Sequence, residues 1–240
     1  AEDFVKGAAT DAGQLIRGKV AGLSITIPDG NPTSTSQISL RGISTLKAGV
    51  SPLVLIDGVP GALNSVAPED IESIDVLKDG SAAAIYGTRG TNGVILITTR
   101  QVLGETPASV ELNSYVSTQK ITKKLNFMNA EQYRKLVQEG KPGATDYGAN
   151  TNWLDEVTQT PISQVYNLSL KGGSKNTSYI ANMNYRSLQG IMKRSDNLVF
   201  FPRVEITHNM FDGRLKFNAN VSGYQQQFFA GADGSSYRTD

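Results

Sequence analysis

The sequence contains no cysteine and only one histidine, His208, among its 240 residues. Without cysteine the chain can form no disulfide, no thiolate metal site and no cysteine nucleophile. A lone histidine argues against most zinc sites and against a Ser-His-Asp triad, because both depend on imidazole groups. We therefore expect no catalytic residue, no metal site and no bound cofactor, and the sequence does not indicate an enzyme.

Long apolar runs and a strong net charge are also missing. No run approaches the roughly 18 apolar residues that a membrane-spanning helix requires. The 23 basic side chains nearly balance 22 acidic ones, which leaves a formal net charge of +1. Because the charges are so nearly balanced, the chain has no strong positive electrostatic field that would attract nucleic acid. The low hydropathy is still compatible with a membrane β-barrel, since barrel strands alternate apolar and polar side chains.

Short elements separated by turn residues fill the first hundred residues. Asp11 and Gln14 have the spacing of a helix N-cap pair, and Gly22 lies beyond the short helix that they begin. Apolar residues then predict strands at 23–27, 38–42, 53–56, 71–77 and 94–98. A helix of small residues is predicted over 79–87, with a glycine at its end. These elements indicate a compact α+β unit.

From Ser109 onward the side chains alternate with a period of two. Each segment has roughly 10 residues, the length that a tilted strand needs to cross a bilayer. We interpret the segments as antiparallel barrel strands; the alternative, a soluble β-sandwich, usually has shorter strands. The apolar positions of the five segments are Val110, Leu112 and Val116; Tyr166, Leu168 and Leu170; Tyr179, Ala181, Met183 and Tyr185; Leu198, Phe200, Val204 and Ile206; Leu215, Phe217, Ala219 and Val221.

The connections between these segments differ in length. A long connection separates the first two segments, whereas 172–176 and 208–213 are tight turns. Outer-membrane barrels show the same asymmetry, with short periplasmic turns and longer external loops. Inside the long connection, Asn129 and Gln132 predict a capped helix that ends before Gly140. We expect this connection to be an ordered external loop.

Five phrases of the N-terminal unit occur in a fixed order: LRG at 40–42, VLIDGVP at 54–60, DIESIDVLKD at 70–79, AAAIYG at 82–87 and RGTNGVILIT at 89–98. In this order and spacing they resemble the plug domain of a TonB-dependent outer-membrane transporter of the SusC/RagA type. The resemblance implies a plug domain over residues 1–104 and the start of a transmembrane β-barrel over 105–240. The expected fold class is an α+β plug domain followed by antiparallel transmembrane β-barrel strands. Because such barrels have about 22 strands, we expect the five segments to be an incomplete part of one.

The resemblance also implies a function and a set of partners. The function is TonB-dependent active import of a glycan or peptide nutrient across the bacterial outer membrane, with the plug gating the barrel lumen and the N-terminus in the periplasm. The implied partners are the TonB-ExbB-ExbD complex, a SusD-like surface lipoprotein, the oligosaccharide or peptide substrate and outer-membrane lipid, but no nucleic acid. Two alternatives stay open, a siderophore or cobalamin receptor and a soluble carbohydrate-binding module.

Charged side chains are dense on the predicted plug. Inside a barrel they would face polar wall residues such as Arg186, Arg203 and Glu205, and ion pairs across that seam would hold the plug. The charges in question, besides those assigned next, are Glu69, Glu72, Asp75 and Lys78. Our hypothesis assigns three plug residues to the plug–barrel seam: Arg41, Arg89 and Asp79.

Two further features have a structural and a functional reading. The glycine-rich segment 87–93 matches neither the P-loop nor the dinucleotide fingerprint, so we interpret it as a turn into the next strand. Several tyrosines suit a membrane-interface girdle, with sugar stacking as the alternative. They are Tyr166, Tyr179, Tyr185 and Tyr224.

Overall fold

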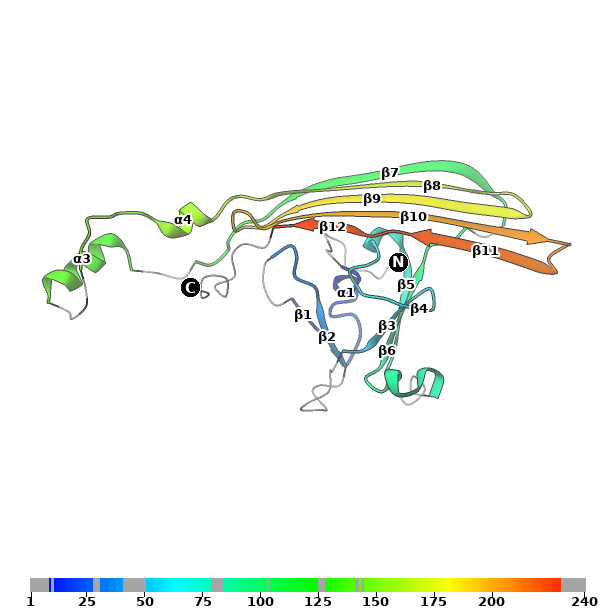
Figure 1. Cartoon of the computed structure of the whole chain (residues 1–240), viewed down its shortest axis with the longest axis horizontal. Helices are drawn as coiled ribbons and strands as arrows, with labels where there is room; N and C mark the ends of the chain where they lie inside the picture. Colours follow the sequence, from blue (N-terminus) through cyan, green and yellow to red (C-terminus); the bar gives the residue numbers. More distant parts are fainter. Residues whose placement is uncertain are drawn as a thin grey trace, which may run out of the picture.

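The computed structural model describes residues 9, 11–27, 31–40, 51–78, 84–102, 104–124, 128–140, 143 and 145–229. They form a small α+β unit, which we call the plug, and a long antiparallel sheet, which we call the wall (Figure 1). The described residues of the plug end at Val102, and the first wall strand begins at Thr106. We propose a domain boundary between residues 104 and 105.

A two-stranded ribbon and a four-stranded mixed sheet build the plug. In the ribbon, β1 (Leu23–Thr26) pairs antiparallel with β2 (Gln37–Leu40). The larger sheet has the order β4-β3-β6-β5, with β3 parallel to β6. Its strands are β3 (Leu53–Ile56), β4 (Val59–Pro60), β5 (Ile71–Leu77) and β6 (Val94–Thr99). The predicted strands are confirmed to within one residue, apart from 41 and 42, which lie outside the described residues.

Two aspartates close turns of the plug. Asp11 is the N-cap of α1 (Ala12–Leu15), and its carboxylate accepts hydrogen bonds from the backbone N–H groups of Gln14 (3.2 Å) and Ser36 (2.8 Å). Asp57 follows β3 with a left-handed φ of 50°, and its carboxylate accepts from the N–H (2.9 Å) and hydroxyl (2.6 Å) of Thr99. The capping aspartate predicted from the sequence is thereby confirmed, and the second aspartate joins the ends of β3 and β6.

Short helices complete the plug around an isoleucine-rich core. η1 (Pro68–Asp70) begins with proline directly before β5, and η2 (Gly87–Gly90) precedes β6. Of the helix predicted over 79–87, the described residues 84–86 are helical. Ile71, Ile95 and Ile97 are at most 2% exposed in the core, and burying each such side chain contributes about 2–3 kcal/mol.

The wall is a meander from β7 to β11 in which each strand pairs antiparallel with the next one along the chain, and β12 also pairs with β10. All five predicted segments are confirmed as strands. The wall strands are β7 (Thr106–Thr118), β8 (Ile162–Gly173), β9 (Thr177–Gln189), β10 (Asp196–Met210), β11 (Leu215–Ser222) and β12 (Gln225–Phe228).

Proline explains why the last wall strand is divided into β11 and β12. Both pieces pair with β10 in one continuous register, with Arg203 opposite Ser222 and Phe200 opposite Gln225. Pro202 lies opposite the break. It accepts a hydrogen bond from Gly223 N–H (2.8 Å) but has no N–H to return one. The sequence pattern ended this strand at Ser222 and missed its continuation.

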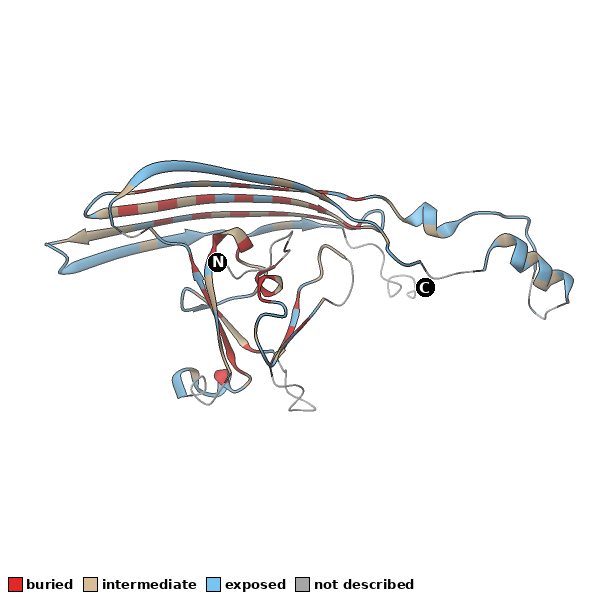
Figure 2. Cartoon of the chain, turned by 180° about the vertical axis from the view of Figure 1, so that it is seen from behind, coloured by how far each residue is buried: buried red, intermediate tan, exposed pale blue. Residues whose placement is uncertain are grey.

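The two faces of the wall have opposite character. Buried and less buried residues alternate along β8, β9 and β10 (Figure 2). The face toward the plug contains Asn184 and Arg186, which are at most 1% exposed, whereas Leu168, Met183 and Val204 on the other face are 40–54% exposed. The predicted alternation is therefore confirmed, and the apolar face is the outer one.

The connections lie at the ends that their lengths predict. The long connection between β7 and β8 contains α3 (Ala130–Gln138) and α4 (Trp153–Val157) and extends beyond one end of the wall (Figure 1). The short turns after β8 and β10 lie at the opposite end. α3 begins with the predicted capping box of Asn129 and Gln132. No helix among the described residues is long and apolar enough to cross a membrane.

Candidate functional site at the plug–wall seam

A buried arginine of the wall forms the centre of the seam between plug and wall. Arg186 lies on the inner face of β9, and its side chain is 1% exposed. Its Nη2 lies 3.2 Å from Glu69 Oε1 and 2.6 Å from the carbonyl oxygen of Ala9, both on the plug. The same nitrogen donates to the hydroxyl of Tyr115 in β7 (3.1 Å). One guanidinium thus contacts two segments of the plug and a second wall strand.

The partner carboxylate is positioned by η1. Pro68 at the first helical position fixes the backbone of this turn, and Glu69 follows it directly. Asn184, two residues before Arg186 on the same face of β9, donates from Nδ2 to the second carboxylate oxygen of Glu69 (3.0 Å). Both oxygens of Glu69 therefore bind the wall. Its side chain remains 21% exposed, so solvent screens this pair in part.

A second charged group lies next to the end of β6. Arg203 of β10 is 5% exposed, donates from Nη1 to the carbonyl oxygen of Arg100 (3.1 Å), and pairs with Glu205 on its own strand. Asn218 donates to the other oxygen of Glu205 (2.9 Å). Asp70 of the plug is 3% exposed nearby. Burial raises the pKa of its carboxyl from 3.8 to about 6, although the Arg203 guanidinium acts in the opposite direction.

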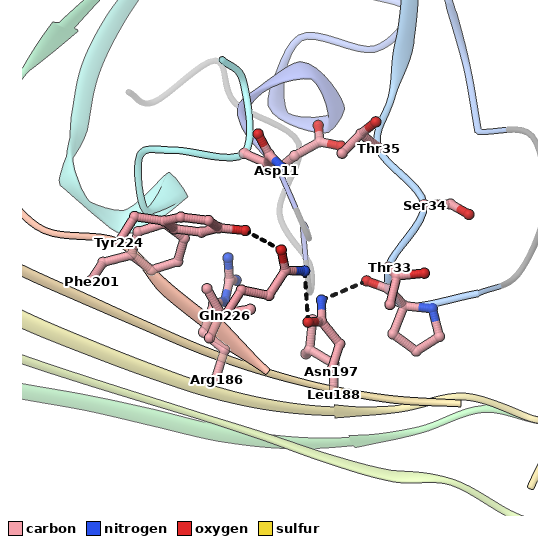
Figure 3. Close-up of a pocket in the computed structure, with 13 residues that line it drawn as sticks. Asp11, Thr33, Ser34, Thr35, Arg186, Leu188, Asn197, Phe201, Tyr224 and Gln226 are labelled. Carbon is pink, nitrogen blue, oxygen red and sulfur yellow. Dashed lines mark hydrogen bonds between the residues drawn. The ribbon is translucent and has the colours of Figure 1, made fainter. Parts of the chain in front are cut away.

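Apolar and neutral polar contacts fill the rest of the seam. Ala67 packs in one buried cluster with Val199 and Phe201 of β10. A chain of hydrogen bonds runs from the Tyr224 hydroxyl to Gln226 (2.5 Å), from Gln226 to Asn197 (2.8 Å), and from Asn197 to the carbonyl oxygen of Pro32 (2.9 Å) (Figure 3). The plug is thus held by contacts on four of its segments, which contain Ala9, Pro32, Glu69 and Arg100.

A polar cleft of about 580 Å³ opens beside the seam, between the β3–β4 turn and strands β10 and β11. Acidic, basic and amide side chains line it, among them Asp57, Asp70, Glu205, Lys216, Asn218 and Asn220. Tyr224 also lines the cleft, and its ring packs against Phe201 with centroids 5.3 Å apart. Tyr224 therefore faces the plug, and its interpretation as a membrane-interface residue is wrong, whereas Tyr166 and Tyr185 are 42–43% exposed on the outer face.

The residues predicted for the seam have different locations. Arg41 and Asp79 lie outside the described residues, and Arg89 is exposed in η2. The wall residues Arg186, Arg203 and Glu205 do line the seam, as the alternation predicts. Glu69 belonged to the set of plug charges but was not singled out, because its partner is 117 residues away in the sequence. The Pro-Glu pair at the start of a turn is the one local signal for it.

The described part of the chain holds no cluster of three or more His, Cys, Asp or Glu side chains that could bind a metal ion. The seam residues instead form ion pairs, hydrogen bonds and van der Waals contacts. Chemically, this arrangement can bind and release a folded domain.

Comparison with known proteins identifies the same two parts. The family model of the TonB-dependent receptor plug domain matches residues 1–94. The TonB-dependent receptor SusC of Bacteroides thetaiotaomicron is 37% identical over 233 residues, which are 92% of this chain and 23% of that protein. A probable TonB-dependent siderophore receptor, PirA of Acinetobacter baumannii, is 36% identical over 100 residues, which are 34% of this chain and 13% of that protein. The chain thus spans about a quarter of the length of SusC, the more fully matched of the two.

Solved structures reproduce the arrangement of plug and wall. The RagAB peptide importer in its closed-closed state superimposes with a TM-score of 0.83 at 24% identity, over 94% of this chain and 30% of that chain. The siderophore receptor PirA superimposes with a TM-score of only 0.54, over 85% of this chain. The long match to SusC and the RagAB fold agree with the five plug phrases, and the chain therefore belongs to the SusC/RagA-type TonB-dependent receptors, of which it carries the plug domain and antiparallel strands of the outer-membrane β-barrel.

Proposed function

We propose that the chain is the gating part of an importer that takes up a glycan or a peptide across the outer membrane, driven by TonB. The observation that carries the proposal is the seating of the plug on the polar inner face of the wall through Arg186, while the outer face is apolar. A wall with these two faces suits lipid outside and a hydrated lumen inside. The name of the RagAB peptide importer supports a peptide, and the glycan alternative comes from the SusC/RagA-type resemblance of the plug phrases.

Transport of this kind makes and breaks no covalent bond. The barrier is the seam itself, and opening it requires the plug to leave its contacts with β9 and β10. We propose that the TonB-ExbB-ExbD complex supplies the force from the periplasmic side and that the N-terminus belongs on this side. A SusD-like lipoprotein is the proposed partner at the opposite side, where the β7–β8 connection projects beyond the wall (Figure 1).

Growth of a deletion strain tests the transport proposal. The full-length gene is deleted in frame, and growth is measured on single glycans, on peptides and under iron limitation. Loss of growth on one glycan or peptide, restored by the wild-type gene, supports the proposal. A defect confined to iron limitation would instead favour a siderophore receptor, the alternative to which the similarity to PirA points.

We also propose that Arg41, Arg89 and Asp79 belong to the plug–barrel seam and contact parts of the barrel other than this wall. Arg89 is exposed on the described surface of the plug, where it is free to meet another part of the barrel. The test reverses the charges of Arg41 and Arg89 in the full-length receptor. Increased passive leakage of a bulky antibiotic is the expected result, and unchanged transport and leakage would contradict the assignment.

A further inference from the structure

Two spaces follow one another along the seam, between the plug and the inner face of the wall. The first has about 20 Å³ and lies between the start of α1 and the wall strands β9, β10 and β12 (Figure 3). The second is the polar cleft of about 580 Å³ between the β3–β4 turn and strands β10 and β11. Neither space is closed on all sides.

The residues that line the two spaces meet at one position of the wall. Along β10 the first space is lined as far as Phe201, and the second is lined from Phe201 onward. Along the last strand, Tyr224 has the same place. The two rings pack with centroids 5.3 Å apart. Phe201 and Tyr224 are the two residues that line both spaces, and their ring pair therefore stands where one space ends and the other begins.

The plug shows the same order on the opposite side. Asn64 lines the first space, and the next three residues, 65–67, line the second. The cleft extends along the last strand as far as Lys216, near the short turn after β10. Because barrel strands run from one side of a membrane to the other, the two spaces lie in sequence along the direction in which a solute crosses.

Tyr224 lies where the pairing of the wall is interrupted. It is opposite Phe201 in the register, between the end of β11 and the start of β12. Gly223 before it lies so close to Pro202 that a Cβ atom at this glycine would be 3.1 Å from the proline Cγ. The Tyr224 side chain is 40% exposed, whereas Phe201 is 6% exposed. Tyr224 is therefore the member of the ring pair that has room to move.

A chain of hydrogen bonds connects this tyrosine to the plug (Figure 3). The Tyr224 hydroxyl donates to Gln226, whose Nε2 donates to Asn197. Asn197 Nδ2 in turn donates to the carbonyl oxygen of Pro32, which belongs to the plug. The position of the tyrosine therefore depends on this plug segment, and a shift of the segment breaks the last bond of the chain.

We infer that Tyr224, packed on Phe201, is the seal that keeps the resting receptor closed to small polar solutes along this side of the plug. The inference rests on the proposed role of the seam as the gate of an importer. Polar groups line both spaces, mainly amides and hydroxyls in the first and charges of both signs in the second. When the Tyr224 ring leaves Phe201, the two spaces join while the plug still contacts Arg186. A glycan or a peptide still requires the plug itself to move.

The conductance of the purified full-length receptor in planar lipid bilayers tests the seal, with KCl as the permeating salt. Tyr224→Ala removes the ring and should give a steady conductance that the wild-type receptor lacks. Tyr224→Phe keeps the ring but loses the hydroxyl, and the loss of one hydrogen bond should make openings about fivefold more frequent. Wild-type conductance in Tyr224→Ala would overturn the inference.

The matched control is Tyr185→Ala. It removes a tyrosine that is 43% exposed on the outer face of the same wall. The conductance of this variant should stay at the wild-type level. A conductance equal to that of Tyr224→Ala would show that the loss of any wall tyrosine makes the receptor leak, and would contradict a specific seal.

Two thiol probes show whether the plug stays seated. Because the chain has no cysteine, Ala67→Cys introduces a single thiol in this chain, at a seam position that is 1% exposed, lines the cleft and packs in one cluster with Phe201. Its labelling rate in the full-length receptor reports how often the seam opens. Ala9→Cys places the thiol instead where the plug backbone contacts Arg186, and Ala9 lines neither space.

The two probes distinguish a broken seal from a loosened plug. In Tyr224→Ala, Ala67→Cys should be labelled faster while Ala9→Cys keeps its wild-type rate, because the passage opens and the plug stays on Arg186. Faster labelling of both thiols would mean that the whole plug has loosened, and would overturn the inference. Neither the conductance nor the labelling needs TonB or a nutrient, so failure of the seal and failure of the transport proposal are distinguishable.

Discussion

At the scale of single residues, the seam leaves few groups that can stabilise the charge of Arg186. A guanidinium that is 1% exposed cannot be solvated by bulk water, so its stability depends on Glu69 and on the neighbouring acceptors. Such a pair does not have to favour the closed plug strongly overall, because the desolvation of both charges offsets much of their attraction. Removing one partner, however, leaves the other buried and uncompensated.

Glu69→Ala should therefore destabilise the seated plug. We expect a cost of about 2–3 kcal/mol, below the usual range for a fully buried pair because Glu69 is 21% exposed. This cost corresponds to a 30- to 150-fold faster labelling of Ala67→Cys in the full-length receptor, at about tenfold per 1.4 kcal/mol. Glu72→Ala is the control, since Glu72 is an exposed plug carboxylate, and should leave the rate unchanged. A wild-type rate for Glu69→Ala would show that Arg186 does not depend on this pair.

Asp70 should make the seam dependent on pH. Burial raises its pKa to about 6 when the plug is seated, against 3.8 when it is exposed to solvent. The seated state thus binds the proton more tightly, and this contribution to stability is present at low pH and lost as the pH rises through about 6. Lowering the pH from 7 to 5 should slow seam opening by about tenfold relative to Asp70→Asn. The intrinsic pH dependence of thiol labelling drops out of this comparison, because both proteins carry the same thiol. An identical pH profile in both proteins would exclude Asp70 as the titrating group.

At the scale of elements, the period of two determines the wall. It gives the five strands, their faces and the end at which each turn lies, because one face must meet lipid and the other the plug. The continuation of the last strand was missed because Gln225–Phe228 follows a break in the strand. The cause of the break is Pro202 on the neighbouring strand β10, so the last strand's own sequence does not show it. The apolar runs of the first hundred residues likewise predicted the plug strands.

The contacts of the seam were less predictable than its elements. The parity of β9 and β10 places Arg186 and Arg203 on the inner face. Which plug residue meets them depends on how two separately folded parts dock, and no periodicity along the chain encodes that. Glu69 lies in a three-residue turn and pairs with a strand residue more than a hundred positions away. The sequence predicted the kind of contact, an ion pair across the seam, and its wall residues, but it did not single out the plug partner Glu69.

The helix α3 in the long connection should depend strongly on its cap. None of its residues is buried, so tertiary packing adds little, and a nine-residue helix is marginal without it. Asn129→Ala removes the acceptor for the Gln132 N–H (2.8 Å) and should cost about 1 kcal/mol of local stability. Hydrogen exchange of the amides of 133–137 should become about fivefold faster. Asn129→Asp keeps the cap and should retain the wild-type exchange rate; equal acceleration in both variants would mean that the cap does not limit opening.

At the scale of the whole molecule, one sheet separates two solvents. Its inner face is polar and is buried over β8, β9 and β10, and its outer face presents apolar side chains from β7 to β11. Exposed residues on that face include Val110, Leu112, Leu168, Met183, Val204 and Phe217. A surface this large on a monomeric soluble protein would be an aggregation hazard or a binding site. When this surface faces lipid, the removal of its apolar side chains from water drives insertion.

A charge added to the wall should therefore act according to the face on which it lies. Leu168→Arg places a cation on the outer face near the middle of β8, where lipid makes it cost about 2–4 kcal/mol. We expect reduced amounts of folded full-length receptor in outer-membrane fractions, measured by heat-modifiable migration. Ser169→Arg adds the same charge one residue later on the inner face, directly opposite Glu111 in the register with β7, and should assemble normally. Equal assembly of the two variants would mean that the apolar face does not meet lipid, since both add the same charge to β8, on opposite faces and one residue apart.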